Sequence, residues 1–194
     1  MNLILIAGIP GSGKTTISQK LSHDMGIACL SKDDIKLQLY EKFGFCSIED
    51  KKKLNELAEA QLYTEIQNSI ALNADLIVDK WYPETEIIMK HGTNDSINII
   101  CIQLMVSAAV AASRYNTRIK NQSRPRVLSI LNQYPEIPNV TIYEPFKTEE
   151  DMLLRIQKTP EIKNAHSYLC ISNDRADIES VYESIKTFVQ NAFV

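Results

Sequence analysis

A glycine-rich stretch near the N-terminus carries the residues with the clearest chemistry. Residues 8–15 read GIPGSGKT and match the phosphate-binding pattern G-x-x-x-x-G-K-[ST]. Backbone N–H groups can converge on phosphate oxygens only where no Cβ stands in the way, and three glycines provide that freedom. We expect Lys14 to act in catalysis by reaching the β and γ phosphates, and Thr15 to ligate Mg²⁺. The predicted nucleotide-binding residues are Gly8, Pro10, Gly11, Ser12, Gly13, Lys14, Thr15 and Thr16.

The segments on either side of this loop fit a nucleotide site. Leu3–Ala7 is an apolar run typical of a buried strand, while Ile17, Leu21 and Met25 recur at helical spacing up to Gly26. The first amides and the positive dipole end of that helix would face the phosphates. A chance Gly/Ser-rich turn is the alternative, which the strand–loop–helix order disfavours. The sequence therefore predicts ATP and Mg²⁺ as cofactors.

Two acidic positions follow predicted strands, at the edge where open α/β sheets bind ligands. Asp33 could accept the proton of a hydroxyl that attacks the γ-phosphate, and we predict that it is catalytic. For Asp34 we favour a capping box with Ser31. Asp79 ends the run LIVD and is predicted to hold Mg²⁺ with Thr15, although a strand-ending aspartate can also simply start a turn. Trp81 is either a wall of the acceptor pocket or a packing residue.

Basic residues gather in one later stretch. No acidic residue lies between Asp95 and Glu136. The basic residues of that window are Arg114, Arg118, Lys120, Arg124 and Arg126. Arg114 and Arg118 are one helical turn apart, and we predict that both stabilise the charge developing on the transferred phosphate. The alternatives are a solvated basic helix end, or recognition of an anionic acceptor such as a phosphorylated sugar or a nucleic-acid end at residues 114–126.

The composition describes an ordinary globular chain of one domain. Of the 194 residues, 44% are hydrophobic and 23% are charged, and the net charge of −3 argues against a general nucleic-acid binder. The four cysteines are scattered, which predicts neither a disulfide nor a zinc site. No run approaches a membrane span and the N-terminus lacks a signal-peptide pattern, so we expect a cytoplasmic protein without a membrane partner.

Apolar segments alternate with helical patterns, as in a parallel sheet covered on both faces. The expected fold is α/β: three layers, α/β/α, with a five-stranded parallel sheet and a proline-rich insertion. Strands are predicted at residues 3–7, 27–30, 76–79, 97–104 and 168–172. Five of the seven prolines fall between Pro125 and Pro160. We predict a single domain over 1–194 in which about 114–160 forms a lid over the substrate.

Helical spacing marks four further helices. Inward positions are predicted at Ile35, Leu39 and Phe43; at Leu54, Leu57, Ala58, Leu62, Ile66 and Ile70; at Met152, Leu153 and Ile156; and at Ile178, Val181, Tyr182, Ile185, Phe188, Val189 and Ala192. The second of these helices is expected to start at Ser47 with Asp50 three residues on, and the third at Thr148 with Asp151.

The motifs IPGSGKTT, SKDDIKLQLY, LIVDKWYPE and AAVAASRYNTR resemble those of small P-loop kinases, within them the polynucleotide-kinase and predicted-kinase group. The resemblance covers about residues 1–120, and it implies that the five-stranded parallel sheet is of the P-loop kinase type. It implies ATP at Gly8 to Thr16, an acceptor-activating Asp33, phosphate-clamping Arg114 and Arg118, and an adenine-contacting turn at Ser172 to Arg175. Members of the group carry an arginine where this chain has Lys36, which cannot make the same bidentate contact.

The favoured hypothesis is an ATP- and Mg²⁺-dependent phosphotransferase that acts on a hydroxyl of a small molecule, a nucleoside or a nucleic-acid 5′ end. A toxin-like kinase of nucleotide sugars and a non-catalytic nucleotide-dependent switch are the alternatives. No N-K-x-D or D-x-x-G motif supports a G-protein-like switch. The sequence does not identify the acceptor, the oligomeric state or the preference between ATP and GTP.

Overall fold

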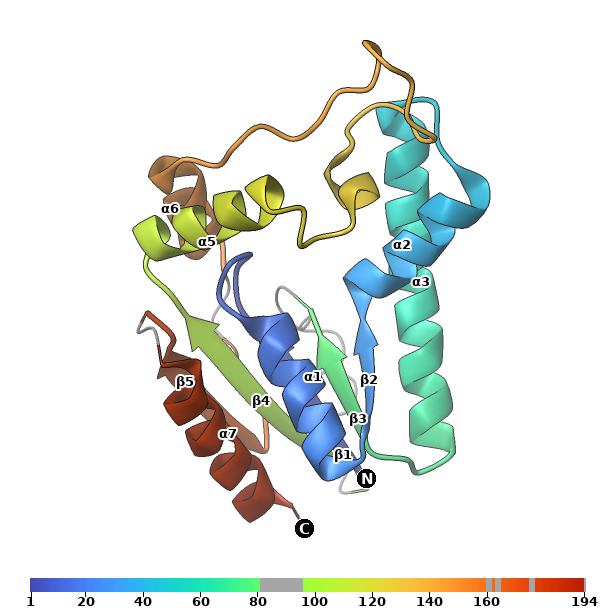
Figure 1. Ribbon diagram of the computed structural model, residues 1–194. Helices are drawn as coiled ribbons and strands as arrows, with labels where there is room; N and C mark the ends of the chain where they lie inside the picture. Colours follow the sequence, from blue (N-terminus) through green and yellow to red (C-terminus); the bar gives the residue numbers. More distant parts are fainter. Residues whose placement is uncertain (81–95, 160–161, 163–164, 175–176, 194) are drawn as a thin grey trace.

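The structure is a computed structural model that describes residues 1–80, 96–159, 162, 165–174 and 177–193 (Figure 1). Within these residues the fold is the predicted three-layer α/β/α arrangement with a five-stranded parallel sheet. The strands are β1 (Asn2–Ala7), β2 (Ala28–Ser31), β3 (Leu76–Asp79), β4 (Asn98–Met105) and β5 (Ser167–Ser172). The helices are α1 (Lys14–Met25), α2 (Lys32–Phe43), α3 (Ile48–Ala71), α5 (Ala108–Lys120), α6 (Glu149–Gln157) and α7 (Ile178–Ala192), with a short 3₁₀ helix, η1, at Arg126–Ser129.

The strand order β2-β3-β1-β4-β5 places the N-terminal strand in the middle of the sheet. Because the strands are parallel, all their carboxyl ends lie at one edge. The register aligns Ile6 of β1 and Ser31 of β2 with Asp79 of β3. The glycine-rich loop after β1 therefore emerges beside the residues that follow β2 and end β3.

Alternate side chains of the buried strand β1 serve the two faces of the sheet. Leu3 and Leu5 pack in a cluster with residues of α2 and α3, whereas Ile4 and Ile6 pack in a second cluster with α1 and α7. The four cysteines are free. No helix among the described residues is long and apolar enough to cross a membrane.

Two of the three expected capping interactions are confirmed. The Ser47 hydroxyl accepts from the backbone N–H of Asp50 at 3.0 Å, and Thr148 and Asp151 form a complete capping box. The predicted box of Ser31 with Asp34 is wrong, because the Ser31 side chain makes no capping hydrogen bond. Ser31 is still part of β2, and its hydroxyl-bearing side chain is buried against the cavity described below.

Three of the residues predicted to face inward are instead on the surface. Phe43, Leu57 and Leu153 are 59%, 47% and 46% exposed. Leu57 and Leu153 each lie next to a residue of the same helix that was correctly predicted to be buried, namely Ala58 and Met152. Phe43 is the last residue of α2, beyond the part that packs on the sheet.

Residues 121–148, between α5 and α6, cross over the carboxyl edge of the sheet (Figure 1). We call this segment the arch. At the α5 end, the Asn116 side chain and the backbone of Lys147 exchange two hydrogen bonds of 2.8 Å. At the α2 end, Phe45 and Tyr134 exchange two backbone hydrogen bonds of 2.8 Å. The arch is therefore held at both sides of the sheet edge. Its role as a lid stays a prediction.

Candidate active site

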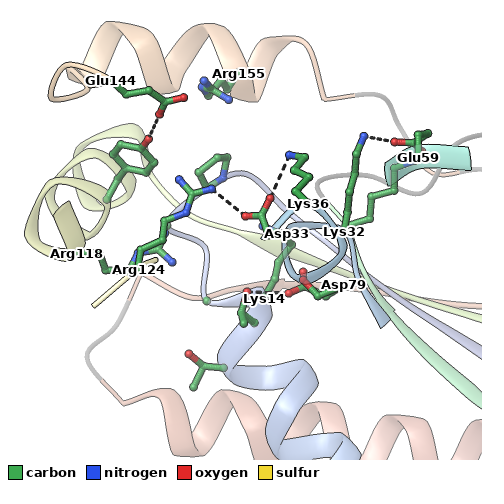
Figure 2. A pocket seen from close by; sticks show the side chains of 18 residues that line it. Lys14, Lys32, Asp33, Lys36, Glu59, Asp79, Arg118, Arg124, Glu144 and Arg155 are labelled. Atoms are coloured by element: carbon green, nitrogen blue, oxygen red, sulfur yellow. Dashed lines mark hydrogen bonds and ion pairs between the residues drawn. The ribbon is translucent and has the colours of Figure 1, made fainter. Parts of the chain in front are cut away.

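The carboxyl edge of the sheet and the arch enclose a cavity of about 440 Å³ (Figure 2). Its walls come from the glycine-rich loop, the start of α1, the ends of β2 and β3, the start of α2, and from α3, α5, α6 and the arch. The lining residues are Pro10, Gly11, Gly13, Lys14, Thr15, Thr16, Ser31, Lys32, Asp33, Lys36, Glu59, Asp79, Lys80, Tyr115, Arg118, Arg124, Glu144 and Arg155. Most of the predicted site residues thus meet in one place.

The glycine-rich loop needs glycine at two close approaches. Gly11 has φ of 89°, and a Cβ there would lie 2.6 Å from the carbonyl oxygen of Ala111 in α5. Gly13 has φ of 93°, and its Cβ would lie 2.6 Å from Nδ2 of Asn173. That amide nitrogen donates to the carbonyl of Ser12 at 2.7 Å. The loop is therefore fixed by α5 on one side and by the turn after β5 on the other.

Lys14 is the first residue of α1 and points back over the loop, where its Nζ donates to the carbonyl of Ile9 at 3.2 Å. Burial lowers the pKa of Lys14, while the carboxylates of Asp79 and Asp33 oppose that shift. A buried ammonium group beside the glycine-rich loop is well placed to bind an anion.

Thr15 and Asp79, the two predicted metal ligands, touch each other. The Thr15 hydroxyl donates to Oδ2 of Asp79 at 2.7 Å, and Asp79 is only 5% exposed. Burial raises the pKa of Asp79, although Lys14 and the Thr15 hydroxyl oppose that effect. The pair fits Mg²⁺, which takes hard oxygen donors and needs only one or two protein ligands when phosphates and water supply the rest. The described residues contain no cluster of three or more His, Cys, Asp or Glu that would form a separate metal site.

Asp33, the predicted acceptor-activating residue, is held by two cations. Its Oδ1 accepts from Lys36 Nζ at 3.1 Å and its Oδ2 from Arg124 Nη2 at 2.9 Å. Burial alone would raise the pKa of Asp33, but the charges and hydrogen bonds of Lys36 and Arg124 outweigh it and bring the pKa down to about 2. Asp33 is therefore ionised at neutral pH.

Of the two arginines predicted to act together, one lines the cavity and the other does not. Arg118 lines the cavity, and its pKa is lowered by burial and by the neighbouring Arg124. Arg114 does not line the cavity, because its Nη1 donates to the carbonyl of Asn173 at 2.8 Å and reaches Gly11 O at 3.5 Å. It ties the turn after β5 to the glycine-rich loop.

The remaining basic residues of 114–126 do not continue a strip along one face. Lys120 lies over the ring of Phe146, with Nζ 5.5 Å from the centroid. Arg126 faces Glu136 at 3.7 Å and stacks on Tyr143. Arg118 and Arg124 line the cavity, so these contacts give no support to the alternative of a nucleic-acid end bound at residues 114–126, which stays a prediction.

Several residues that line the cavity were not among the predicted site residues. Lys32 and Lys80 both form ion pairs with Glu59, which comes from the middle of α3 (Figure 2). Glu144 accepts a hydrogen bond from the Tyr115 hydroxyl, and Arg155 reaches the cavity from α6. Only Lys32 and Lys80 had a usable signal, namely their position next to the ends of predicted strands.

Two predicted contacts lie wholly or partly outside the described residues. Trp81 is one of them. Of the turn after β5, Ser172 to Asp174 are described and Arg175 is not. Asp174 caps the start of α5 by accepting from the backbone N–H of Ser107 at 2.6 Å.

Comparison with known proteins identifies related sequences and folds. A family model described as an AAA domain matches residues 3–129. A cytidylate kinase from Ignicoccus hospitalis is 36% identical over 58 residues, which are 30% of this chain and 31% of the relative, so the match spans under a third of that protein.

Solved structures match over nearly the whole chain. A candidate kinase from Chloroflexus aurantiacus has a TM-score of 0.76 at 21% identity, covering 100% of this chain and 98% of its own. A gluconokinase from Sinorhizobium meliloti has a TM-score of 0.59 at 12% identity, covering 98% and 93%. A shikimate kinase from Acinetobacter baumannii, solved with shikimate, has a TM-score of 0.51 at 16% identity, covering 98% and 93%. At these identities the likeness establishes the fold alone.

Proposed function

The chain belongs to the AAA-domain family, and from this premise we propose that it is an ATP- and Mg²⁺-dependent phosphotransferase that transfers the γ-phosphate to an acceptor hydroxyl. The observation that carries the proposal is the meeting of Lys14, Asp33 and the Thr15–Asp79 pair in one cavity. This set combines an anion-binding cation, a carboxylate that can take a proton and oxygen donors for a metal.

Each residue has a distinct part in the proposed reaction. Lys14 and the loop amides bind the phosphates, and Thr15 with Asp79 would hold the ion. Bound Mg²⁺ would neutralise phosphate charge and fix the orientation of the triphosphate. Asp33 takes the hydroxyl proton as the acceptor oxygen bonds to the γ-phosphorus and the bond to the bridging oxygen breaks. Arg118 stabilises the charge on the transferred phosphate, and ADP is released.

The acceptor is proposed to be a small molecule. The arch is held at both ends over the cavity, and the inward-facing basic residues of 114–126, Arg118 and Arg124, line that same cavity. The names of the relatives suggest gluconate and shikimate as the first hydroxyl acceptors to test, and cytidylate as an acceptor that offers a phosphate oxygen instead.

The test measures ADP formation from MgATP with a panel of acceptors: gluconate, shikimate, cytidylate, nucleosides, neutral sugars and a 5′-hydroxyl oligonucleotide. At least one acceptor should raise turnover above the rate with water alone, and Lys14→Ala should abolish that increase. Lys20→Ala is the matched control, since Lys20 lies on the same helix but pairs with Glu179 on the outer surface. Undiminished turnover in Lys14→Ala would overturn the proposal. A 5′-hydroxyl oligonucleotide as the best acceptor would overturn the small-molecule assignment.

A further inference from the structure

The carboxylate assigned to activate the acceptor is covered on both oxygens. Lys36 donates to Oδ1 of Asp33 and Arg124 donates to Oδ2. A carboxylate with two cationic donors is a weak proton acceptor, because both donors stabilise its charged form. In the arrangement observed, an acceptor hydroxyl would have to displace one of these donors before Asp33 could accept its proton.

The two donors differ in how they are attached. Lys36 lies three residues after Asp33 on the same helix, α2, so its position is tied to that of the carboxylate. Arg124 comes from the segment that follows α5, 91 residues further along the chain. Arg124 is therefore the donor whose backbone is independent of the helix that carries Asp33.

A phosphate group bound in the cavity would be a second possible partner for the Arg124 guanidinium. Arg124 lines the same walls as Lys14 and Arg118, and its charge contributes to lowering the pKa of both, after the larger effect of burial (Figure 2). Three cations thus converge next to a loop of backbone amides. A phosphate group bound there would attract all three, and the planar guanidinium fork suits phosphate oxygens better than an ammonium does.

We propose that Arg124 is a further catalytic residue, which leaves Asp33 for the terminal phosphate of the bound nucleotide and so frees the carboxylate for the acceptor hydroxyl. This inference rests on the proposed function, since it requires nucleotide phosphates at the loop. The hydroxyl proton then moves to Oδ2 of Asp33 as the acceptor oxygen bonds to the γ-phosphorus. The bond from the γ-phosphorus to the bridging oxygen breaks, and ADP leaves with that oxygen. Nucleotide binding consequently precedes productive acceptor binding, which keeps the base covered until a phosphate is there to transfer.

The test needs no acceptor, because Asp33 and the nucleotide compete for one guanidinium. The probe is the magnesium complex of a non-hydrolysable ATP analogue, and its Kd is measured by calorimetry for wild type, Asp33→Asn, Arg124→Gln and the double variant. Asp33→Asn should tighten binding about tenfold in the wild-type background, in line with the strength of hydrogen bonds between charged groups. In the Arg124→Gln background the gain should fall to about threefold or less, since only the removal of a nearby negative charge still acts.

Lys36→Met is the matched control, because it removes the other donor on Asp33. Asp33→Asn should keep its roughly tenfold effect in that background. Equal gains with and without Arg124 would overturn the inference, because the guanidinium would then stay on Asp33 when nucleotide binds. If Asp33→Asn lacks the wild-type circular-dichroism spectrum, Asp33→Ala replaces it in the same cycle. Failure of the wild-type protein itself to bind the analogue would instead overturn the proposed function.

Discussion

Replacing Gly11 by alanine tests the claim that the glycine-rich loop is shaped by its contact with α5. Gly11 has φ of 89°, and an added Cβ would lie 2.6 Å from the carbonyl oxygen and 3.0 Å from the Cα of Ala111. Both are backbone atoms inside a helix and cannot rotate away. A left-handed conformation costs an L-residue about 1–2 kcal/mol. Forcing atoms into a filled space adds about 1–3 kcal/mol, so Gly11→Ala should destabilise the fold by roughly 2–5 kcal/mol.

Gly26 provides a matched control for the conformational part of this cost. It has φ of 66° at the end of α1, and an added Cβ there meets nothing within 4 Å. Gly26→Ala should therefore cost only about 1–2 kcal/mol. Equilibrium unfolding in urea gives both free energies of unfolding. Equal losses in the two variants would refute the reasoning, because the contact with Ala111 would then contribute nothing.

Two further predictions concern charged residues of the cavity. The pKa of Asp33, held near 2, lies below its ordinary value of 3.8, so its pairing stabilises the fold above pH 4 and the effect is lost as pH falls toward 2. Because the Asp33 side chain is 47% exposed, solvent screening limits the contribution to about 1 kcal/mol. In urea unfolding, Asp33→Asn should be less stable than wild type by that amount at pH 6, and the difference should shrink toward pH 2. A difference that does not depend on pH would contradict this reasoning. Arg118→Ala should lower kcat about 10³-fold with the acceptor identified from the panel. Arg114→Ala should mainly weaken nucleotide binding, because it loosens the glycine-rich loop. Equal losses of kcat in the two variants would contradict the different positions of the two arginines.

Local rules were sufficient to predict the sheet. The run at residues 76–79 matches β3 at both ends, and the other four predicted strands match the observed ones to within one residue at each end. Buried parallel strands are short apolar runs, and each was bounded by a recognisable turn or helix pattern. Thr15 and Asp79 were predicted as partners for the same reason, since a loop and a strand end at one sheet edge must lie close together.

Helical spacing was less accurate for apolar residues at the border of a helix's buried face. It placed Leu57 inside, although the contact surface of α3 is narrow enough for Ala58, Leu62 and Ile66 to fill it. An apolar residue next to the stripe can stay exposed at little cost. The Ser31–Asp34 box failed for a different reason: the pattern was present, but Ser31 belongs to a strand whose register with Asp79 already fixes its surroundings.

The contact between Asp33 and Arg124 could not have been predicted from spacing, because it depends on how the arch crosses the sheet edge. Arg124 stands just before η1, whose Val127 and Leu128 pack with Tyr40 of α2. This packing brings the end of the basic stretch over the start of α2, so the guanidinium of Arg124, for which no individual role was predicted, lies on the proposed base. The same packing limits how far the segment can move. An exchange of Arg124 between Asp33 and a phosphate is therefore a motion of one side chain within a fixed wall, and it needs no opening of the arch.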